Sequence, residues 1–222
     1  HNIQDFCRRE GKAVSGRVLD FGCGTKPYKE YLPSVSEYIG VEYDKQLGES
    51  EHYLRNGVYF YGGCKLPFES NAFDAIVSFQ VFEHVRQLEK SLAELIRVAK
   101  PGAQFLFTLP LLWPEHETPA DFRRFTRWGI EKLLLQMGLV VDHVKPMGTV
   151  YDVIIVFWLD YMNTHRSWLL RKLAPLVASP LNFAARILNR FDRWAVRSDR
   201  FCYLDLSIVA HKPFSAYTVR LS

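Results

Sequence analysis

The sequence predicts an α/β fold, a doubly wound sheet of mainly parallel strands. Short apolar segments alternate along the 222 residues with amphipathic segments of helical length, which is the pattern of parallel strands joined by helical crossovers. A short strand of buried type also runs directly into a glycine turn at residues 18–24. The expected strands are seven: residues 18–21, 38–42, 58–61, 75–79, 104–109, 140–145 and 201–211.

Composition and charge indicate a single soluble, globular domain over residues 1–222. Hydrophobic residues make up 48% of the chain and charged residues 23%. The longest uninterrupted apolar run, Val153–Leu159, is too short to span a bilayer. The four cysteines are scattered and form no C-x-x-C pair. This cysteine usage favours a reducing, cytoplasmic location and argues against a zinc–cysteine site.

The first strand is expected to end in a sharp turn that can approach a ligand. Gly22 and Gly24 lack a Cβ, so the backbone can bend tightly and come close to a bound group. Thr25 suits the N-cap of a following helix, and Pro27 suits its first turn. The free N–H groups of such a turn and helix start can hold an anionic ligand group.

An acidic residue ends the second strand. Glu42 follows the glycine turn by about 20 positions, the spacing at which a carboxylate accepts hydrogen bonds from ribose hydroxyls in dinucleotide-binding folds. Asp44, two residues further on, is the competing candidate for the same role. The sequence therefore predicts a nucleoside-binding carboxylate at this strand end.

Three motifs follow one another in the first half of the chain. They are a hydrophobic-hydrophobic-D-x-G-x-G segment at Val18–Gly24, an LPF…FD segment at Leu66–Asp74 and a V-F-E-H-V segment at Val81–Val85. In this order, residues 16–110 resemble the class I S-adenosylmethionine (SAM) methyltransferases. The resemblance implies SAM as the cofactor and a Rossmann-like, seven-stranded sheet. It also implies that the last strand, 201–211, is antiparallel and inserted beside the sixth.

The resemblance also implies a set of cofactor contacts. These are Asp20, Gly22, Cys23 and Gly24 at the methionine end, Glu42 at the ribose, Gln80 at the neighbouring edge of the cofactor, and Cys64 near the adenine. Members of the family usually carry an Asp shortly before Leu66, where it contacts the adenine amino group. This chain has no acid there, so backbone groups near Cys64 are expected to hold the adenine instead.

A long polar and aromatic loop follows the fifth strand, at the carboxyl edge of the sheet where open α/β folds bind ligands. Its pattern H-x-x-P-x-D-x-x-R-F-T-x-x-G, at His116–Gly129, is similar to that of methyltransferases from bacterial surface-polysaccharide and O-antigen clusters. The similarity implies an enzyme of polysaccharide biosynthesis that O-methylates a sugar, a lipid-linked glycan or another small-molecule hydroxyl.

A hydroxyl acceptor benefits from a general base, and two histidines are candidates. His116 is the first and His84 the second, because histidine, with an unperturbed pKa of ~6.5, needs little tuning to act at neutral pH. Trp113 and Arg123 are expected beside His116 at the acceptor side of the pocket. There, Arg123 can pair bidentately with a phosphate or carboxylate of the acceptor.

A metal site is the alternative role for the region around the two histidines. Glu83, His84, His116 and a nearby carboxylate could supply ligands. The metal-dependent small-RNA 2′-O-methyltransferases carry E-x-x-E-H after the fourth strand, but here Gln80, a weak ligand, replaces the first Glu. We therefore expect that no metal is required.

Residues 149–198 are extra to a minimal methyltransferase and are predicted to form a helical cap beside the acceptor pocket. Residues 166–197 contain seven Lys or Arg and one Asp, a net charge of +6, which leaves −2 for the rest of a chain whose total is +4. The apolar face of the segment can pack on its own domain or lie in the interface of the inner face of the membrane. Its apolar face is expected to carry Phe183, Ile187, Phe191 and Trp194, and its basic face Arg186, Arg190, Arg193 and Arg197.

Three other functions compete with this interpretation. A nicotinamide oxidoreductase would need a third glycine at position 27, where Pro27 stands. A catalytically silent module that binds a partner through its basic insert would not need the intact glycines and Glu42. An RNA-directed methyltransferase would use the arginines, but their grouping on one amphipathic stretch fits a surface helix better than a nucleic-acid groove. The expected partner is therefore a small-molecule or glycan acceptor, and the sequence does not determine an oligomeric state.

Overall fold

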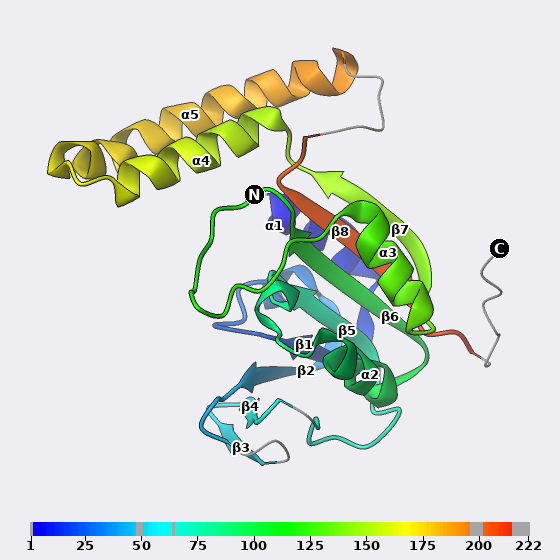
Figure 1. The fold of residues 1–222 in the computed structure, drawn as a ribbon. Helices are drawn as coiled ribbons and strands as arrows, with labels where there is room; N and C mark the ends of the chain where they lie inside the picture. The colour runs from blue at the N-terminus through cyan, green and yellow to red at the C-terminus, as the bar shows by residue number, and fades with distance from the viewer. Residues whose placement is uncertain (1, 48–50, 64, 196–201, 215–222) are drawn as a thin grey trace.

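The computed structural model describes residues 2–47, 51–63, 65–195 and 202–214, which form one mixed sheet with helices on both faces (Figure 1). The strands are β1 (Ser15–Phe21), β2 (Ser34–Tyr43), β3 (His52–Arg55), β4 (Val58–Tyr61), β5 (Phe73–Phe79), β6 (Ala99–Pro110), β7 (Val140–Met147) and β8 (Asp205–His211). The α-helices are α1 (Asn2–Glu10), α2 (Leu88–Val98), α3 (Arg127–Gln136), α4 (Val150–Thr164) and α5 (Trp168–Ala195). Three short 3₁₀ turns are η1 (Gly11–Ala13), η2 (Lys29–Tyr31) and η3 (Phe82–His84).

The strand order is β3-β4-β2-β1-β5-β6-β8-β7. The central pairs β4–β2, β2–β1, β1–β5 and β5–β6 are parallel. Strand β8 lies between β6 and β7 and is antiparallel to both. The predicted doubly wound sheet is therefore confirmed, together with the antiparallel last strand inserted beside the sixth predicted strand.

The sheet has one strand more than the seven expected, among the residues that the structure describes. The additional strand is β3, which pairs antiparallel with β4 at the edge of the sheet and is exposed along its whole length. Asn56 and Gly57 join the two strands, both with positive φ (51° and 73°). Asn-Gly is the preferred pair for a two-residue hairpin turn, because such turns need left-handed backbone at both positions.

The helix expected after the glycine turn is absent, which corrects the sequence-based prediction. The chain forms only the single 3₁₀ turn η2 before β2 begins. Pro27 and Pro33 bracket this segment, and each disfavours α-helical backbone in the residue before it. The five residues between the two prolines are too few for a stable helix. No α-helical N-terminus is therefore available to bind an anion at this turn.

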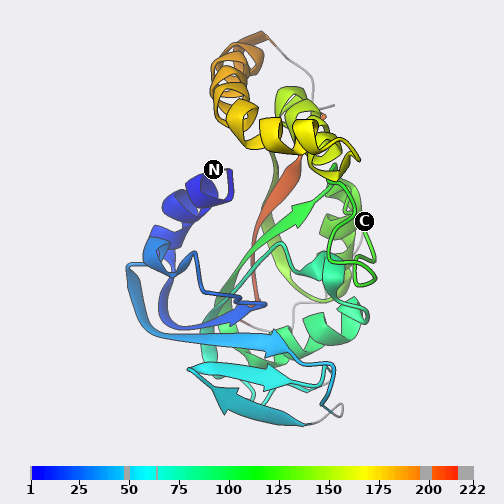
Figure 2. The same cartoon turned by 90° about the vertical axis from the view of Figure 1, so that its left-hand side faces the viewer.

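The helices divide between the two faces of the sheet (Figure 2). α1 covers one face, where Phe6 packs with Val18 and Val77 of the central strands. α2 and α3 cover the other face, where buried side chains such as Leu92 and Ile130 meet the aromatic residues of β6. Because both faces of the central strands are covered, these strands are apolar on both sides.

The segment predicted to be extra to a minimal methyltransferase, residues 149–198, is helical in its described part, as predicted. It forms a hairpin of α4 and α5 (Figure 1). A capping box between Thr149 and Asp152 starts α4. The two helices pack on each other and extend beyond the β8–β7 edge of the sheet. Large apolar side chains stay exposed on the hairpin, among them Ile154, Leu176 and Phe183. The side chains of Arg186, Arg190, Arg193, Arg197, Phe191 and Trp194 lie outside the described residues.

Candidate functional site

A cavity of about 610 Å³ lies at the carboxyl ends of the parallel strands. Its wall combines Phe21 and Gly22 at the end of β1, residues 41–43 at the end of β2, residues 61–63 at the end of β4, residues 84–87 after β5, and three residues of the 113–126 loop. This volume is within the roughly 300–1,000 Å³ of small-molecule sites. The cavity therefore lies where the strand order predicts ligand binding. None of its lining residues comes from 149–198, so the hairpin does not cap it in this arrangement.

The two glycines of the first turn meet different requirements. Gly22 has φ +75°, and a Cβ there would lie 2.4 and 2.5 Å from the methyl carbons of Val81, so only glycine fits. Gly24 has φ +47°, and a Cβ there would meet no atom within 4 Å. Gly22 thus lets the turn pack against the segment after β5, whereas Gly24 borders open space. The Gly24 N–H donates a hydrogen bond directly to the Glu42 carboxylate.

The structure distinguishes the two carboxylates at the end of β2. Glu42 lines the cavity. Asp44 is not on the cavity wall, and its oxygens accept hydrogen bonds from the Gln46 N–H (2.9 Å) and the Tyr53 hydroxyl (3.0 Å). The geometry therefore favours Glu42 as the nucleoside-binding acid.

Two further predicted cofactor residues lie beneath the turn and not on the cavity wall. Asp20 is 2% exposed, and its carboxylate accepts a hydrogen bond from the Tyr38 hydroxyl. Burial raises the pKa of Asp20 to about 7, although the Tyr38 hydrogen bond opposes that shift. Cys23 is also buried, and burial raises the pKa of its thiol to about 12. Both residues support the turn from below in this arrangement.

We expect Asp20→Asn to gain stability relative to the wild type as the pH rises from about 4 to about 7. The Asp20 carboxyl ionises near 3.8 in an unfolded chain but near 7 in the folded one. Its contribution to folding is therefore complete below pH ~4 and is lost as the pH approaches ~7. Asn does not titrate and still offers an oxygen to Tyr38. Urea unfolding across this pH range measures the difference; a pH-independent difference would contradict the assignment.

Gln80 ends β5 with a left-handed backbone, at φ +57°. Its side chain lies beside Asp205, whose pKa is raised to about 7 by burial, with the Gln80 amide opposing that shift. Gln80 is not among the residues that line the cavity. Cys64, the predicted adenine contact, lies outside the described residues. The roles of these two residues stay predictions.

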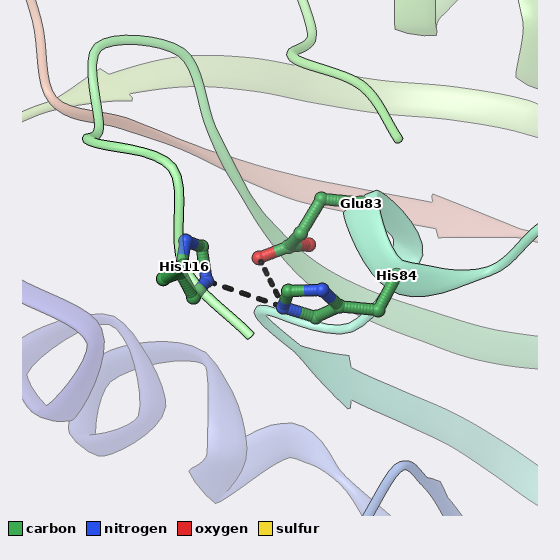
Figure 3. A group of neighbouring side chains, drawn as sticks. All are labelled: Glu83, His84 and His116. Carbon is green, nitrogen blue, oxygen red and sulfur yellow. Dashed lines mark hydrogen bonds and ion pairs between the residues drawn. The ribbon is translucent and has the colours of Figure 1, made fainter. Parts of the chain in front are cut away.

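The two predicted catalytic histidines are brought together (Figure 3). His84, in η3, lines the cavity, and its Nε2 atom lies 3.2 Å from Nε2 of His116 in the loop after β6. Glu83 lies beside them, with Oε1 3.8 Å from Nε2 of His84. The Glu83 side chain is fully buried, and burial raises its pKa to about 7. Two imidazoles and a carboxyl therefore converge behind the cavity wall.

An internal ion pair fixes the loop that carries His116. Both oxygens of Asp121 accept hydrogen bonds from the Arg124 guanidinium, which also donates to the carbonyl groups of Trp113 and Pro114. The same Asp121 carboxylate accepts the N–H of His116 at 3.0 Å. The Arg124 guanidinium holds the pKa of Asp121 well below its usual range. The sequence reasoning missed this pair, although the D-x-x-R spacing within the loop motif carried the signal.

The two predicted acceptor-binding residues are placed near the histidines but not on the cavity wall. The Trp113 ring centroid is 6.4 Å from that of His116. The Arg123 guanidinium donates to the carbonyl oxygens of Val85 and Arg86. In this arrangement, Arg123 ties the loop to the segment after β5.

Comparison with known families supports the motif-based resemblance. Residues 19–107 match the profile of a family described as a methyltransferase domain. The matched region begins in β1, includes the glycine turn and Glu42, and ends in β6. The loop that carries His116 and the α4–α5 hairpin lie outside it.

Individual relatives agree with this result. The chain is 38% identical over 103 residues to an uncharacterized methyltransferase of Schizosaccharomyces pombe, covering 39% of this chain and 37% of that protein. It is 30% identical over 145 residues to a probable SAM-dependent methyltransferase of Mycolicibacterium smegmatis, covering 61% and 56%. The chain therefore spans less than two thirds of the length of these relatives.

Among solved structures, the cyclase SpnF superposes with a TM-score of 0.59 at 18% identity, covering 96% of this chain and 81% of that one. At this identity the likeness shows the fold alone. Because SpnF is named as a cyclase and not as a methyltransferase, the shared fold does not fix the reaction. The chemistry of this chain depends on the residues of its own site.

Proposed function

We propose that this chain is a class I SAM-dependent methyltransferase, and that it transfers a methyl group to a hydroxyl of a sugar, a lipid-linked glycan or another small molecule. The observation that carries the proposal is the cavity at the strand ends, whose wall includes both Gly22 and Glu42 and, at its other side, His84. The open space at Gly24 fits a cofactor that passes close to the turn backbone.

SAM, when bound, supplies an electrophilic methyl group on a sulfonium. In the transfer, the acceptor oxygen forms a bond to the methyl carbon as the carbon–sulfur bond breaks, and the hydroxyl proton must leave. The chain's main contribution is to hold the two reactants in line within the cavity. We assign uptake of the proton to the His84–His116 pair, with His84 as the member on the cavity wall.

Calorimetry and an acceptor screen test this function. We expect S-adenosylhomocysteine to bind the purified chain and NAD to give no heat. Radiolabelled SAM should then methylate neutral sugars or lipid-linked glycans in preference to RNA. Binding of NAD without any response to S-adenosylhomocysteine would overturn the cofactor. Cofactor binding without transfer to any acceptor would favour a silent binding module, and transfer to RNA alone would contradict the acceptor class.

Replacing Glu42 by Ala should weaken S-adenosylhomocysteine binding by about 1.5–3 kcal/mol, the range for hydrogen bonds to a charged group. Glu42 lines the cavity at the strand end where the ribose is expected. Asp44→Ala is the matched control, because Asp44 lies two residues away but off the cavity wall. Calorimetry of both variants should show loss only for Glu42→Ala. A larger loss for Asp44→Ala would reverse the assignment.

We also propose that the α4–α5 hairpin contacts anionic membrane surfaces. No helix among the described residues has the length and apolar character needed to cross a bilayer. The hairpin nevertheless exposes Leu176 at 70% and Phe183 at 64%, both on α5. This second helix lies in a stretch of net charge +6 (residues 166–197). Apolar side chains combined with basic charge suit the interface of an anionic bilayer, where each basic residue contributes about 1 kcal/mol.

Co-sedimentation with liposomes at low salt tests the membrane contact. We expect the chain to bind anionic vesicles more strongly than neutral ones, and the double variant Leu176→Ser/Phe183→Ser to lose that binding. Trp128→Ser is the matched control, because Trp128 is equally exposed, at 70%, but lies on α3. Equal or absent binding to both vesicle types would contradict the contact.

A further inference from the structure

We propose that Glu83, His84 and His116 bind a divalent transition-metal ion behind the wall of the cavity. One ligand atom from each residue lies within 4.8 Å of the others, and Figure 3 shows the three side chains pointing toward one another. The binding of a cation is independent of the methyl acceptor. Only its consequence for the acceptor hydroxyl rests on the proposed function.

The hydrogen bonds of the two imidazoles determine which nitrogen is free. The Nδ1–H of His84 donates to the Ala120 carbonyl oxygen at 2.8 Å, and that of His116 donates to the Pro114 carbonyl oxygen at 3.2 Å. A carbonyl oxygen can only accept, so in each neutral ring the proton is on Nδ1. Both Nε2 atoms then carry lone pairs, and these atoms face each other at 3.2 Å.

The Glu83 carboxylate adds a third acceptor next to the two facing Nε2 atoms. Its side chain is 0% exposed, and neither carboxylate oxygen has a hydrogen-bond partner among the described residues. A buried carboxylate without a hydrogen-bond donor is costly, and the nearby Arg124 guanidinium only partly offsets that cost. When Glu83 is ionised, three acceptors therefore converge with no donor between them, an arrangement that a bound cation relieves.

The spacing of the three groups suits a metal. For metal–nitrogen distances of ~2.1 Å, adjacent ligand atoms in tetrahedral or octahedral sites lie about 3.0–3.4 Å apart. The 3.2 Å between the two Nε2 atoms is within this range. Glu83 lies 3.8 Å from His84 and within 4.8 Å of His116, so its carboxylate must move toward both imidazoles to complete the site. Metal-bound histidines generally donate their other N–H to a carbonyl or carboxylate, as both do here.

The ligand set indicates the class of metal. Two imidazoles and one carboxylate favour Zn²⁺, Mn²⁺ or a similar first-row ion over Mg²⁺ or Ca²⁺, which prefer oxygen ligands alone. Because His84 lines the cavity, a metal held by its Nε2 would lie next to the cavity. A hydroxyl bound to the metal would lose its proton more readily, and the proton would then pass to solvent. The proton uptake assigned above to the His84–His116 pair therefore applies to the metal-free protein, because a metal-bound Nε2 has no lone pair left for a proton.

Calorimetry on tag-free, chelator-treated protein tests the site. We expect Zn²⁺ and Mn²⁺ to bind at one ion per chain and to raise the thermal unfolding midpoint, and Mg²⁺ to bind at least tenfold more weakly. His116→Ala and Glu83→Gln should each weaken Zn²⁺ binding at least tenfold. His211→Ala is the matched control, because His211 pairs with Asp142 on another part of the surface.

The variants must remain folded for the comparison, so S-adenosylhomocysteine binding is measured in parallel. Variants that still bind S-adenosylhomocysteine but no longer bind Zn²⁺ would support the metal site. If the wild type itself does not bind S-adenosylhomocysteine, that result would count against the proposed function and not against the metal site. Absence of Zn²⁺ and Mn²⁺ binding by the wild type, or equal binding by all three variants, would overturn the site. In that case the facing histidines share a proton and bind no metal.

Discussion

Replacing Gly24 by Val is expected to abolish S-adenosylhomocysteine binding while the domain stays folded. A Cβ at this position meets no atom within 4 Å, so the added side chain occupies the open space through which we propose that the cofactor passes. The left-handed backbone, with φ +47°, adds about 1–3 kcal/mol of strain. Calorimetry should show no binding, and thermal unfolding should show one cooperative transition at a lower midpoint.

Two other glycines separate ligand exclusion from strain. Gly138→Val places the same residue at φ +85°, also with nothing within 4 Å. Gly138 follows α3, whereas Gly24 is two residues from Gly22, which lines the cavity. Gly138→Val should lower stability to a similar extent and leave cofactor affinity unchanged. Gly22→Ala should destabilise the fold itself, because its Cβ would collide with Val81. Normal cofactor binding by Gly24→Val would show that the ligand does not pass this turn.

Removal of the Arg124 side chain should destabilise the fold by about 3–5 kcal/mol, the range for breaking a buried ion pair on one side. The Asp121 side chain is only 3% exposed, so Arg124→Ala leaves a buried carboxylate without its counter-charge. The loop would also lose its contacts with Trp113 and Pro114, and His116 would lose its fixed position. We therefore expect methyl transfer and metal binding to fall together with stability in urea unfolding.

Arg8→Ala is the matched control for this effect. Arg8 pairs with Asp5 at the same i,i+3 spacing, but both side chains are more than half exposed, at 56% and 65%. Exposed helical pairs of this kind contribute about 0.3–0.5 kcal/mol. Equal, small losses for Arg8→Ala and Arg124→Ala would show that the loop ion pair does not hold the loop.

Local patterns predicted most of the sheet and the core helices. Amphipathic spacing in α2 and α3, and apolar runs in the central strands, are properties of neighbouring residues, and burial on both faces then fixes them. The glycine turn and Glu42 were also predictable, because backbone freedom and a strand-end acid are local requirements. The sequence pattern missed β3, where an exposed edge strand shows no hydrophobic period, and it predicted a helix between Pro27 and Pro33 that the spacing of the prolines does not permit.

The sequence by itself predicted the resemblance to methyltransferases, the sheet and the position of the glycine turn, because these depend on residues close together in the chain. The tertiary structure decided that Asp20 lies beneath the turn, and that Asp121 and Arg124 fix the loop. It also placed His116 against His84, 32 positions earlier, with the unpartnered carboxylate of Glu83 beside them. Whether a buried acid finds a donor depends on every element packed around it, and no spacing within the sequence records that.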